Sequence, residues 1–212
     1  EEEEEGRKRY GDYLSQWVHE IKTPLASLSL ILDNGGDKGK MKREIKKAEN
    51  LTDTILSLSR LDNVHKDKNI KEIDIRSMVD EAIRDQMSLL IPQGIKIEVE
   101  GEGWALTDHM LFSSILRQIL SNAAKYAPRS TVRFSISPHF LTIEDNGPGI
   151  PSHEIKRVTE KGYVGERWKD KNGSGMGLYI VNELSKELSI SFSIESEEGV
   201  YTRFLFSFPE LF

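Results

Sequence analysis

The sequence contains no cysteine, which excludes disulfide frameworks and thiolate metal sites and removes any argument for an oxidising compartment. It has no apolar run near the roughly 18 residues that a membrane-spanning helix needs. Its first five residues are glutamate, unlike a secretory signal. Basic residues are not in excess, and the net charge of −6 disfavours non-specific binding to nucleic acid. A cytosolic setting is therefore expected.

The composition that remains is typical of a folded protein. With 212 residues, the chain has room for one large domain or two small ones. Hydrophobic residues make up 37% and charged residues 30%, enough for a core and an ordinary polar surface. We therefore expect a globular chain without long disordered parts.

Apolar residues in the first third recur at steps of three and four, which is typical of bundled helices. Pro24 is expected to kink the first helix, and Asn34, Gly35 and Gly36 form a turn signal. The two seams are Leu14, Val18, Ile21, Leu25, Leu28 and Leu32, then Ile45, Ala48, Leu51, Ile55, Leu58 and Leu61. A lone two-helix hairpin buries little surface, so we predict that it pairs with a second copy as a four-helix bundle.

After Asn69 the pattern changes to short alternating segments interleaved with helical ones, which predicts an α/β domain of mixed topology. Seven of the 16 glycines lie between Asp145 and Gly177, so this segment is predicted to be a mobile loop. The predicted strands are 70–75, 95–100, 131–137, 140–144, 189–195 and 201–208, and the predicted helices are 77–90, 109–127 and 177–188.

The first motif whose residue types are suited to catalysis begins at His19 and includes Glu20, Thr23 and Pro24. At about 100° per residue, His19 lies roughly 100° from Val18 and therefore faces water beside the seam. A neutral imidazole is a nucleophile at pH 7, and Glu20 is a candidate proton acceptor. A lone exposed histidine usually has no role, so the other motifs decide its meaning.

Gln118, Asn122 and Lys125 share one helix face and offer two amide oxygens and an ammonium, groups suited to a Mg²⁺-bound polyphosphate. Asp145 follows an apolar strand and precedes Gly147 and Gly149. Its carboxylate can accept a hydrogen bond from an exocyclic amine such as that of adenine, although a plain turn would look similar.

Gly173, Gly175 and Gly177 precede Leu178 at the start of a helix, an arrangement that can hold an anion. The spacing fits neither a dinucleotide fold nor a P-loop, so it indicates a different ATP fold.

The order of the four motifs resembles the H, N, G1 and G2 boxes of bacterial sensor histidine kinases, from about Tyr10 onward. Three further segments, 17–24, 59–62 and 161–165, resemble the intramembrane-sensing subfamily that detects cell-envelope stress and peptide antibiotics. The fold implied is a helical hairpin at 1–69 that forms a dimeric four-helix bundle, then an α/β sandwich at 70–212 of the gyrase, chaperone and histidine-kinase ATPase type.

The resemblance also implies roles. His19 would accept the phosphoryl group of ATP with Glu20 as general base, and Thr23 would serve a phosphatase activity. Asn122 would bind Mg²⁺ with help from Gln118. The implied ATP-binding residues are Asn122, Lys125, Tyr126, Asp145, Gly147, Gly149, Gly173, Gly175, Gly177 and Leu178.

In this family the lid over the nucleotide often carries a phenylalanine. Here the corresponding segment has Val158 and Thr159, with Tyr163 as its aromatic residue, and Gly147 and Gly149 are the expected hinges.

The expected partners are a second copy of the chain and the receiver domain of a response regulator, with membrane helices upstream in the full protein and this core in the cytoplasm. Two other classes stay open. A pure ATPase of the gyrase and chaperone type would lack the His19 to Pro24 motif, and a silent dimerisation scaffold would not need His19, Asn122 and Asp145 together.

Overall fold

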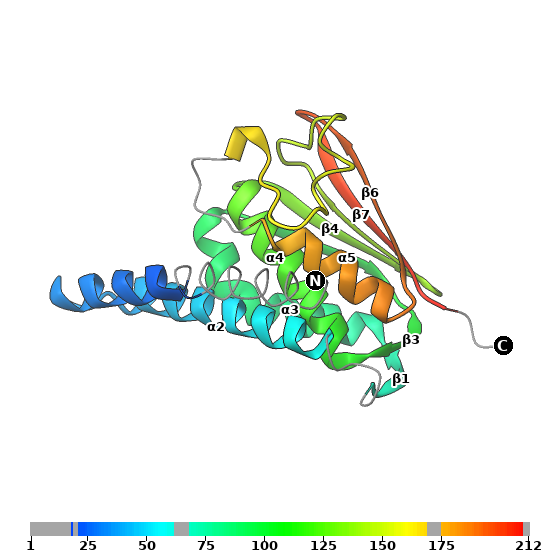
Figure 1. Ribbon diagram of the computed structural model, residues 1–212, viewed down its shortest axis with the longest axis horizontal. Helices are drawn as coiled ribbons and strands as arrows, with labels where there is room; N and C mark the ends of the chain where they lie inside the picture. The colour runs from blue at the N-terminus through cyan, green and yellow to red at the C-terminus, as the bar shows by residue number, and fades with distance from the viewer. Residues whose placement is uncertain (1–17, 19–20, 62–67, 169–174, 210–212) are drawn as a thin grey trace, which may run out of the picture.

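The computed structural model describes residues 18, 21–61, 68–168 and 175–209 (Figure 1). The first described elements are a helix over 21–33, which continues past Pro24, and helix α2 (Lys38–Leu61). Gly35 and Gly36 adopt φ values of 98° and 69° in the turn between them, a region that favours glycine. Asp37 caps α2 by accepting a hydrogen bond from the Lys40 amide at 2.9 Å. Over residues 21–61 the predicted helices and the turn between them are confirmed.

A five-stranded sheet forms one layer of the rest of the chain, in the strand order β2-β4-β5-β7-β6. Strands β2 and β4 are parallel, and the other neighbours are antiparallel. The strands are β2 (Lys96–Gly101), β4 (Thr131–Ser137), β5 (Phe140–Asp145), β6 (Ser191–Glu197) and β7 (Tyr201–Ser207).

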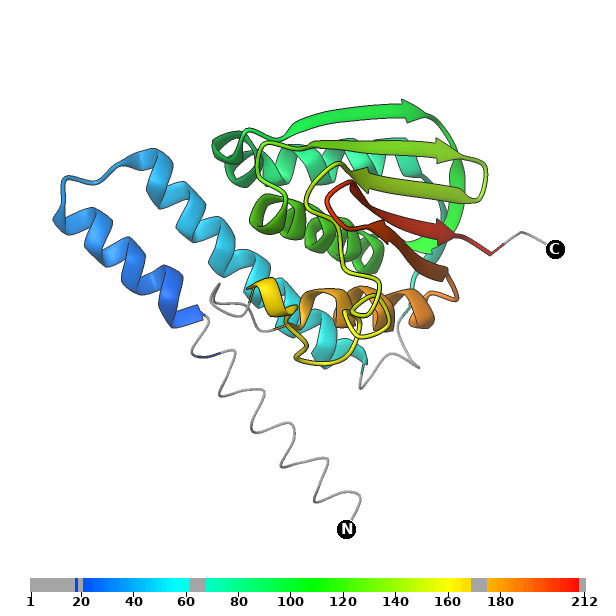
Figure 2. The same cartoon turned by 90° about the horizontal axis from the view of Figure 1, so that it is seen from above.

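Three helices cover one face of this sheet (Figures 1 and 2). They are α3 (Ile75–Leu90), α4 (His109–Tyr126) and α5 (Gly177–Glu187), and a short 3-10 turn η2 (Ile91–Gln93) follows α3. Alternate residues of β4, β5 and β7 point toward the helices, as period-two patterning requires. The core closes where Phe112 of α4 meets the rings of Phe206 and Phe208, at centroid distances of 5.8 and 5.0 Å.

The sequence patterns missed strand β3 (Trp104–Asp108), which pairs antiparallel with β1 (Ile70–Asp74) in a separate two-stranded sheet. Both strands run directly into helices. Asp74 caps α3, so that Ile75 is helical rather than the end of a strand, and Asp108 caps α4 by accepting from the Met110 and Leu111 amides. β3 is so short, and follows so closely on two glycines, that its own sequence reads as part of a loop.

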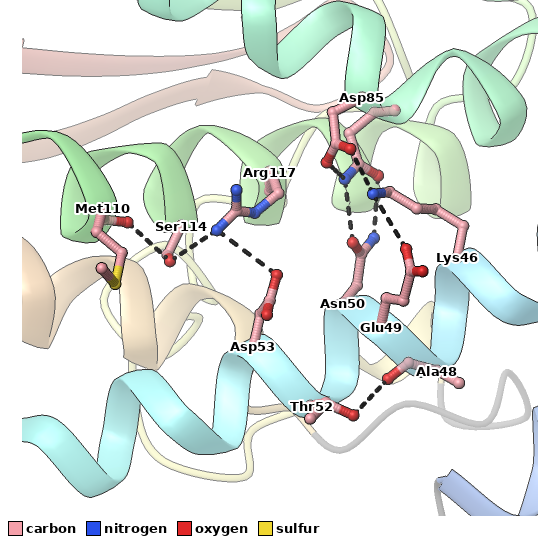
Figure 3. Close-up of polar contacts among 11 residues, drawn as sticks. Lys46, Ala48, Glu49, Asn50, Thr52, Asp53, Asp85, Met110, Ser114 and Arg117 are labelled. Carbon is pink, nitrogen blue, oxygen red and sulfur yellow. Dashed lines mark hydrogen bonds and ion pairs between the residues drawn. The ribbon is translucent and has the colours of Figure 1, made fainter.

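Helix α2 packs against α3, α4 and α5, and polar side chains join it to α3 and α4 (Figure 3). Ile55, one of the residues predicted to form the seam of the bundle, is half-buried and packs against the core of the α/β part. None of the described helices is long and apolar enough to cross a membrane.

Candidate functional site

The second and fourth motifs meet where α4 and α5 pack together. Gly177 opens α5, and a methyl group on its Cα would overlap Gln118 Nε2 and lie 3.2 Å from Asn122 Oδ1. The polar face of α4 that was predicted from spacing therefore borders the glycine-rich end of α5. A side chain at position 177 would force the Gln118 amide to move from its place.

The N-terminal end of α5 brings several backbone amides together. Its N-cap is Met176, whose side chain makes no capping hydrogen bond, and its first turn carries no acidic residue. Such an end favours anions, because several amides and the positive end of the helix dipole converge there. Leu178 lies half-buried in the first turn. The arrangement suits the phosphate chain of a nucleotide.

Gly175 joins this end of α5 to the preceding loop. Its φ is 64°, and a methyl group there would overlap the backbone of Gly162 and Tyr163. Gly173, expected to wrap the triphosphate with Gly175 and Gly177, lies outside the described residues. The segment around Gly162 is thereby held beside the start of α5.

Asp145 lies at the end of β5 and is 8% exposed. Its Oδ1 accepts a hydrogen bond from the Gly147 amide at 2.9 Å. Burial raises the pKa of its carboxyl to about 6, the Gly147 hydrogen bond opposes this rise, and the nearby Glu144 charge adds to it. A buried carboxylate with one oxygen bonded to the backbone can accept a hydrogen bond from an amine of a ligand.

Close packing explains both glycines after Asp145. A methyl group on Gly147 would lie 2.5 Å from Asp145 Oδ1 and 2.6 Å from the Ala127 Cβ. Gly149 has a φ of 65° and lies against the backbone of Glu197, the last residue of β6, and of Glu198, which begins the turn to β7. The hinge role expected for Gly147 and Gly149 stays a prediction.

Tyr126, at the end of α4, packs against an aromatic residue that the motif analysis missed. The Lys125 ammonium lies 5.1 Å from the centre of the Tyr126 ring, and Trp168 packs edge-on against that ring at 5.3 Å. Trp168 belongs to the 3-10 turn η3 (Glu166–Trp168). Tyr163 is therefore not the only aromatic residue of the loop. The presence of a tryptophan in a glycine-rich segment was the feature of the sequence that could have identified Trp168.

The loop between Gly149 and η3 is folded on itself, which qualifies the prediction of mobility. Glu154, 5% exposed, accepts a hydrogen bond from the Glu166 amide at 3.0 Å. The Arg157 guanidinium stacks 4.5 Å from the centre of the Tyr163 ring, and burial raises the pKa of the Tyr163 hydroxyl. Glu154 is a residue that sequence reasoning missed, because its partner is twelve positions away.

His19 and Glu20 lie outside the described residues, so their roles stay predictions. Thr23 is described, exposed on the helix over 21–33, just before the buried Pro24. The described site therefore consists of Gln118, Asn122 and Lys125 on α4, the start of α5, Asp145, and the loop that carries Trp168.

The chemistry of these side chains suits a nucleotide and a metal ion. Amide oxygens such as those of Gln118 and Asn122 are suitable Mg²⁺ ligands, and they border the anion-attracting end of α5. Asp145 offers a buried acceptor for the base.

Comparison with known proteins agrees with this geometry. Residues 107–211 match the family of histidine kinase-, DNA gyrase B-, and HSP90-like ATPases. The sensor protein BceS of Halalkalibacterium halodurans is 32% identical over 208 residues, which cover 94% of this chain and 62% of that protein. The sensor histidine kinase GraS of Staphylococcus epidermidis is 30% identical over 213 residues, which cover 96% of this chain and 62% of that protein.

A solved structure shares the fold. Full-length ShkA in complex with AMPPNP matches 94% of this chain and 47% of its own, with a TM-score of 0.61 and 20% sequence identity. The chain spans 62% of the length of the two curated relatives. The relatives agree with the order of the motifs and with the contact of Gly177 with Asn122. The chain belongs to the bacterial sensor histidine kinases.

Proposed function

We propose that this chain is the cytoplasmic core of a membrane-bound sensor histidine kinase, which phosphorylates His19 from ATP and passes the phosphoryl group to an aspartate of a response regulator. Residues 1–69 form the dimerising and phosphotransfer hairpin, and residues 70–212 form the ATP-binding domain. The observation that carries this proposal is the approach of Gly177 to Gln118 and Asn122 at the start of α5.

We assign binding of the nucleotide to residues of α4, the start of α5 and the end of β5. Asn122, with Gln118, would hold the Mg²⁺, and the amides at the start of α5, with Gly175 and Leu178, would hold the phosphates. Lys125 and Tyr126 would line the phosphate and adenosine side, and Asp145 would accept a hydrogen bond from the adenine amine. The solved ShkA complex with AMPPNP supports an ATP analogue in this fold. When bound, ATP supplies the γ-phosphoryl group.

The phosphoryl acceptor follows from the first motif. His19 would attack the γ-phosphorus of ATP through its unprotonated ring nitrogen, with ADP as the leaving group, and Glu20 would take the proton from the other ring nitrogen. Thr23 lies one turn further along, about 40° around the helix, where its hydroxyl could position a water for hydrolysis of the regulator's aspartyl phosphate. This gives the same core a phosphatase activity.

Dimerisation is proposed from exposed apolar residues of the hairpin. Leu25 is 49% exposed, Leu32 57% and Ile45 44%, which is costly for side chains of this kind in water. A second hairpin packed against them would bury this surface in a four-helix bundle.

Two other functions are less well supported by these residues. A gyrase- or chaperone-type ATPase would share Asn122, Asp145 and the start of α5, but it would have no use for the motif from His19 to Pro24. A silent scaffold would not need Asp145, which is buried at a cost to stability.

Incubation with γ-labelled ATP and Mg²⁺ tests the proposal. The chain should acquire label that is lost in acid and kept in base, as expected for phosphohistidine. His19→Gln should abolish labelling while ATP binding stays intact. His109→Gln is the matched control, because this exposed histidine pairs only with Glu81 among the described residues and should be dispensable. Full labelling of the His19→Gln variant would refute the proposal.

A further inference from the structure

His153, Glu154 and Glu166 bring three metal-binding groups together in the loop that follows Gly149. One ring nitrogen of His153 and one carboxylate oxygen from each glutamate lie within 4.8 Å of one another. None of these residues belongs to the four motifs or to the set assigned to the nucleotide. Imidazole and carboxylate donors from separate side chains are a typical ligand set for a transition metal. The cluster therefore has the chemistry of a metal site separate from that of the nucleotide.

Glu154 supplies the buried donor of this cluster. The residue is only 5% exposed, and the charge of a buried carboxylate is normally compensated by a basic side chain or by a metal ion. Within the described part of the chain, no lysine or arginine forms an ion pair with Glu154. Arg157 of the same loop pairs with Glu160 instead, at 3.4 Å. A cation from solution would supply the missing compensation.

The neighbours of Glu154 hold its carboxylate in place. Its Oε1 accepts a hydrogen bond from the Glu166 amide at 3.0 Å, and the Tyr163 hydroxyl also hydrogen-bonds this side chain. A methyl group on Gly165 would lie 2.6 Å from Oε2, so the glycine leaves room for that oxygen. Carboxylates that bind metals are commonly oriented by such hydrogen bonds, and a carboxylate has lone pairs enough for both roles. Glu154 is therefore positioned as a ligand before any metal binds.

The three donors suit Zn²⁺ better than Mg²⁺. Zn²⁺ binds imidazole nitrogen and carboxylate oxygen at about 2.0–2.2 Å in a tetrahedral site, which places its ligand atoms roughly 3.4 Å apart. His153 and Glu166 are exposed, so small rotations of their side chains can bring the donors to that spacing, and a water can complete the site. Mg²⁺ prefers a near-ideal octahedron of oxygen ligands. It should therefore compete poorly for this cluster.

A metal ion bound here would connect two separate parts of the loop. His153 and Glu154 lie near its start, whereas Glu166 is the first residue of η3. Two positions later in η3, Trp168 packs against the Tyr126 ring of α4 at a centroid distance of 5.3 Å. The bound ion would therefore fix the place of η3, and with it the contact between the loop and α4.

We propose that His153, Glu154 and Glu166 bind one Zn²⁺ ion, which ties the start of the loop to η3. This ion is distinct from the Mg²⁺ assigned to α4. The inference goes beyond the proposed function and does not depend on it, because the binding is measured without nucleotide and without phosphoryl transfer.

Calorimetric titration of the full chain with zinc chloride, in a large excess of Mg²⁺, tests the site. The wild type should bind one Zn²⁺ per chain. His153→Ala and Glu166→Gln should each weaken this binding about tenfold or more, because each removes a direct ligand. His109→Gln is the matched control, because His109 pairs with a single carboxylate, that of Glu81, in the described part of the chain. A wild type without saturable binding, or equal affinity in His153→Ala, would overturn the inference.

Hydrogen exchange locates the bound ion and guards against a folding defect. Zn²⁺ should slow amide exchange within residues 151–168 of the wild type, and Zn²⁺ binding that leaves exchange there unchanged would overturn the role of the loop. Glu154→Gln keeps an acceptor for the Glu166 amide but removes the charge, so this variant should show no such slowing. His153→Ala and Glu166→Gln change exposed side chains, so their titrations decide the question even if Glu154→Gln does not fold.

Discussion

Gly177, the first residue of α5, faces Asn122 of α4 so closely that a methyl group on its Cα would lie 3.2 Å from Asn122 Oδ1. The same methyl group would overlap Gln118 Nε2. The glycine therefore preserves the space in which two amide side chains can turn toward a metal-bound phosphate. This relationship leads to the first prediction.

Gly177→Ala should weaken binding of Mg²⁺-ATP at least tenfold, because the new methyl group displaces Gln118. Its stability should hardly fall, since alanine is favoured over glycine in a helix by about 1 kcal/mol and offsets part of the crowding. Isothermal titration and chemical denaturation measure the two effects. Gly39→Ala in the first turn of α2 is the control, and equal losses of affinity in both variants would contradict the role of Gly177.

The raised pKa of Asp145 predicts that the free energy of unfolding depends on pH. Its pKa in the folded chain is about 6, above the ordinary value of 3.8, so the folded state binds more protons between these values. The chain without nucleotide should therefore lose stability as the pH rises from about 4 to about 6, by an order of 2 to 3 kcal/mol. Denaturation midpoints of the wild type and of Asp145→Asn, which should lack this component, measure the effect.

The same substitution should act on affinity in the opposite direction. Asp145→Asn should raise stability at pH 7 yet weaken ATP binding about tenfold or more, because the charged acceptor for the adenine amine is lost. Wild-type affinity should rise as the pH increases through about 6, whereas the variant should show no such step. A variant that binds as tightly as the wild type would remove Asp145 from the site.

Thr23→Ala should separate two activities. Labelling of His19 should stay within a few-fold of the wild type, while loss of phosphate from the response regulator slows sharply, because the hydroxyl that positions the water is gone. Time courses with the phosphorylated regulator measure this. If both activities fall together, Thr23 serves the geometry at Pro24, and if neither changes it has no catalytic part.

Arg203 should contribute to the stability of the sheet without affecting the site. It contacts Glu144 and Glu195 on the two neighbouring strands, within a row of alternating charge that crosses all five strands. The row consists of Glu98, Arg133, Glu144, Arg203 and Glu195. Arg203→Met should cost about 1 kcal/mol, less at high salt, with unchanged ATP affinity.

Arg133→Met is the matched control for Arg203. Arg133 hydrogen-bonds Glu98 alone, so its loss should cost less than that of Arg203, as urea denaturation would measure. An equal or larger cost at Arg133 would show that the second carboxylate beside Arg203 adds nothing.

The sequence alone determined which helix and which strand carry the candidate site residues. The spacing of Gln118, Asn122 and Lys125 predicted one helix face, and the apolar residues before Asp145 predicted the end of a strand, as observed. These predictions succeed because periodicity and turn chemistry are local properties, set by residues within a few positions of one another.

Tertiary structure decided which of these elements meet, because those contacts join residues far apart in the chain. β3 exists through pairing with β1, Trp168 packs on Tyr126 from across the loop, and Gly177 reaches Asn122 from a different helix. Gln86 reads in the sequence as an ordinary polar helix residue, yet it is buried because Asn50, thirty-six positions earlier, completes its hydrogen bonds. The free energy of such contacts depends on burial and hydrogen-bond geometry, which arise only after the helices and the sheet have packed together.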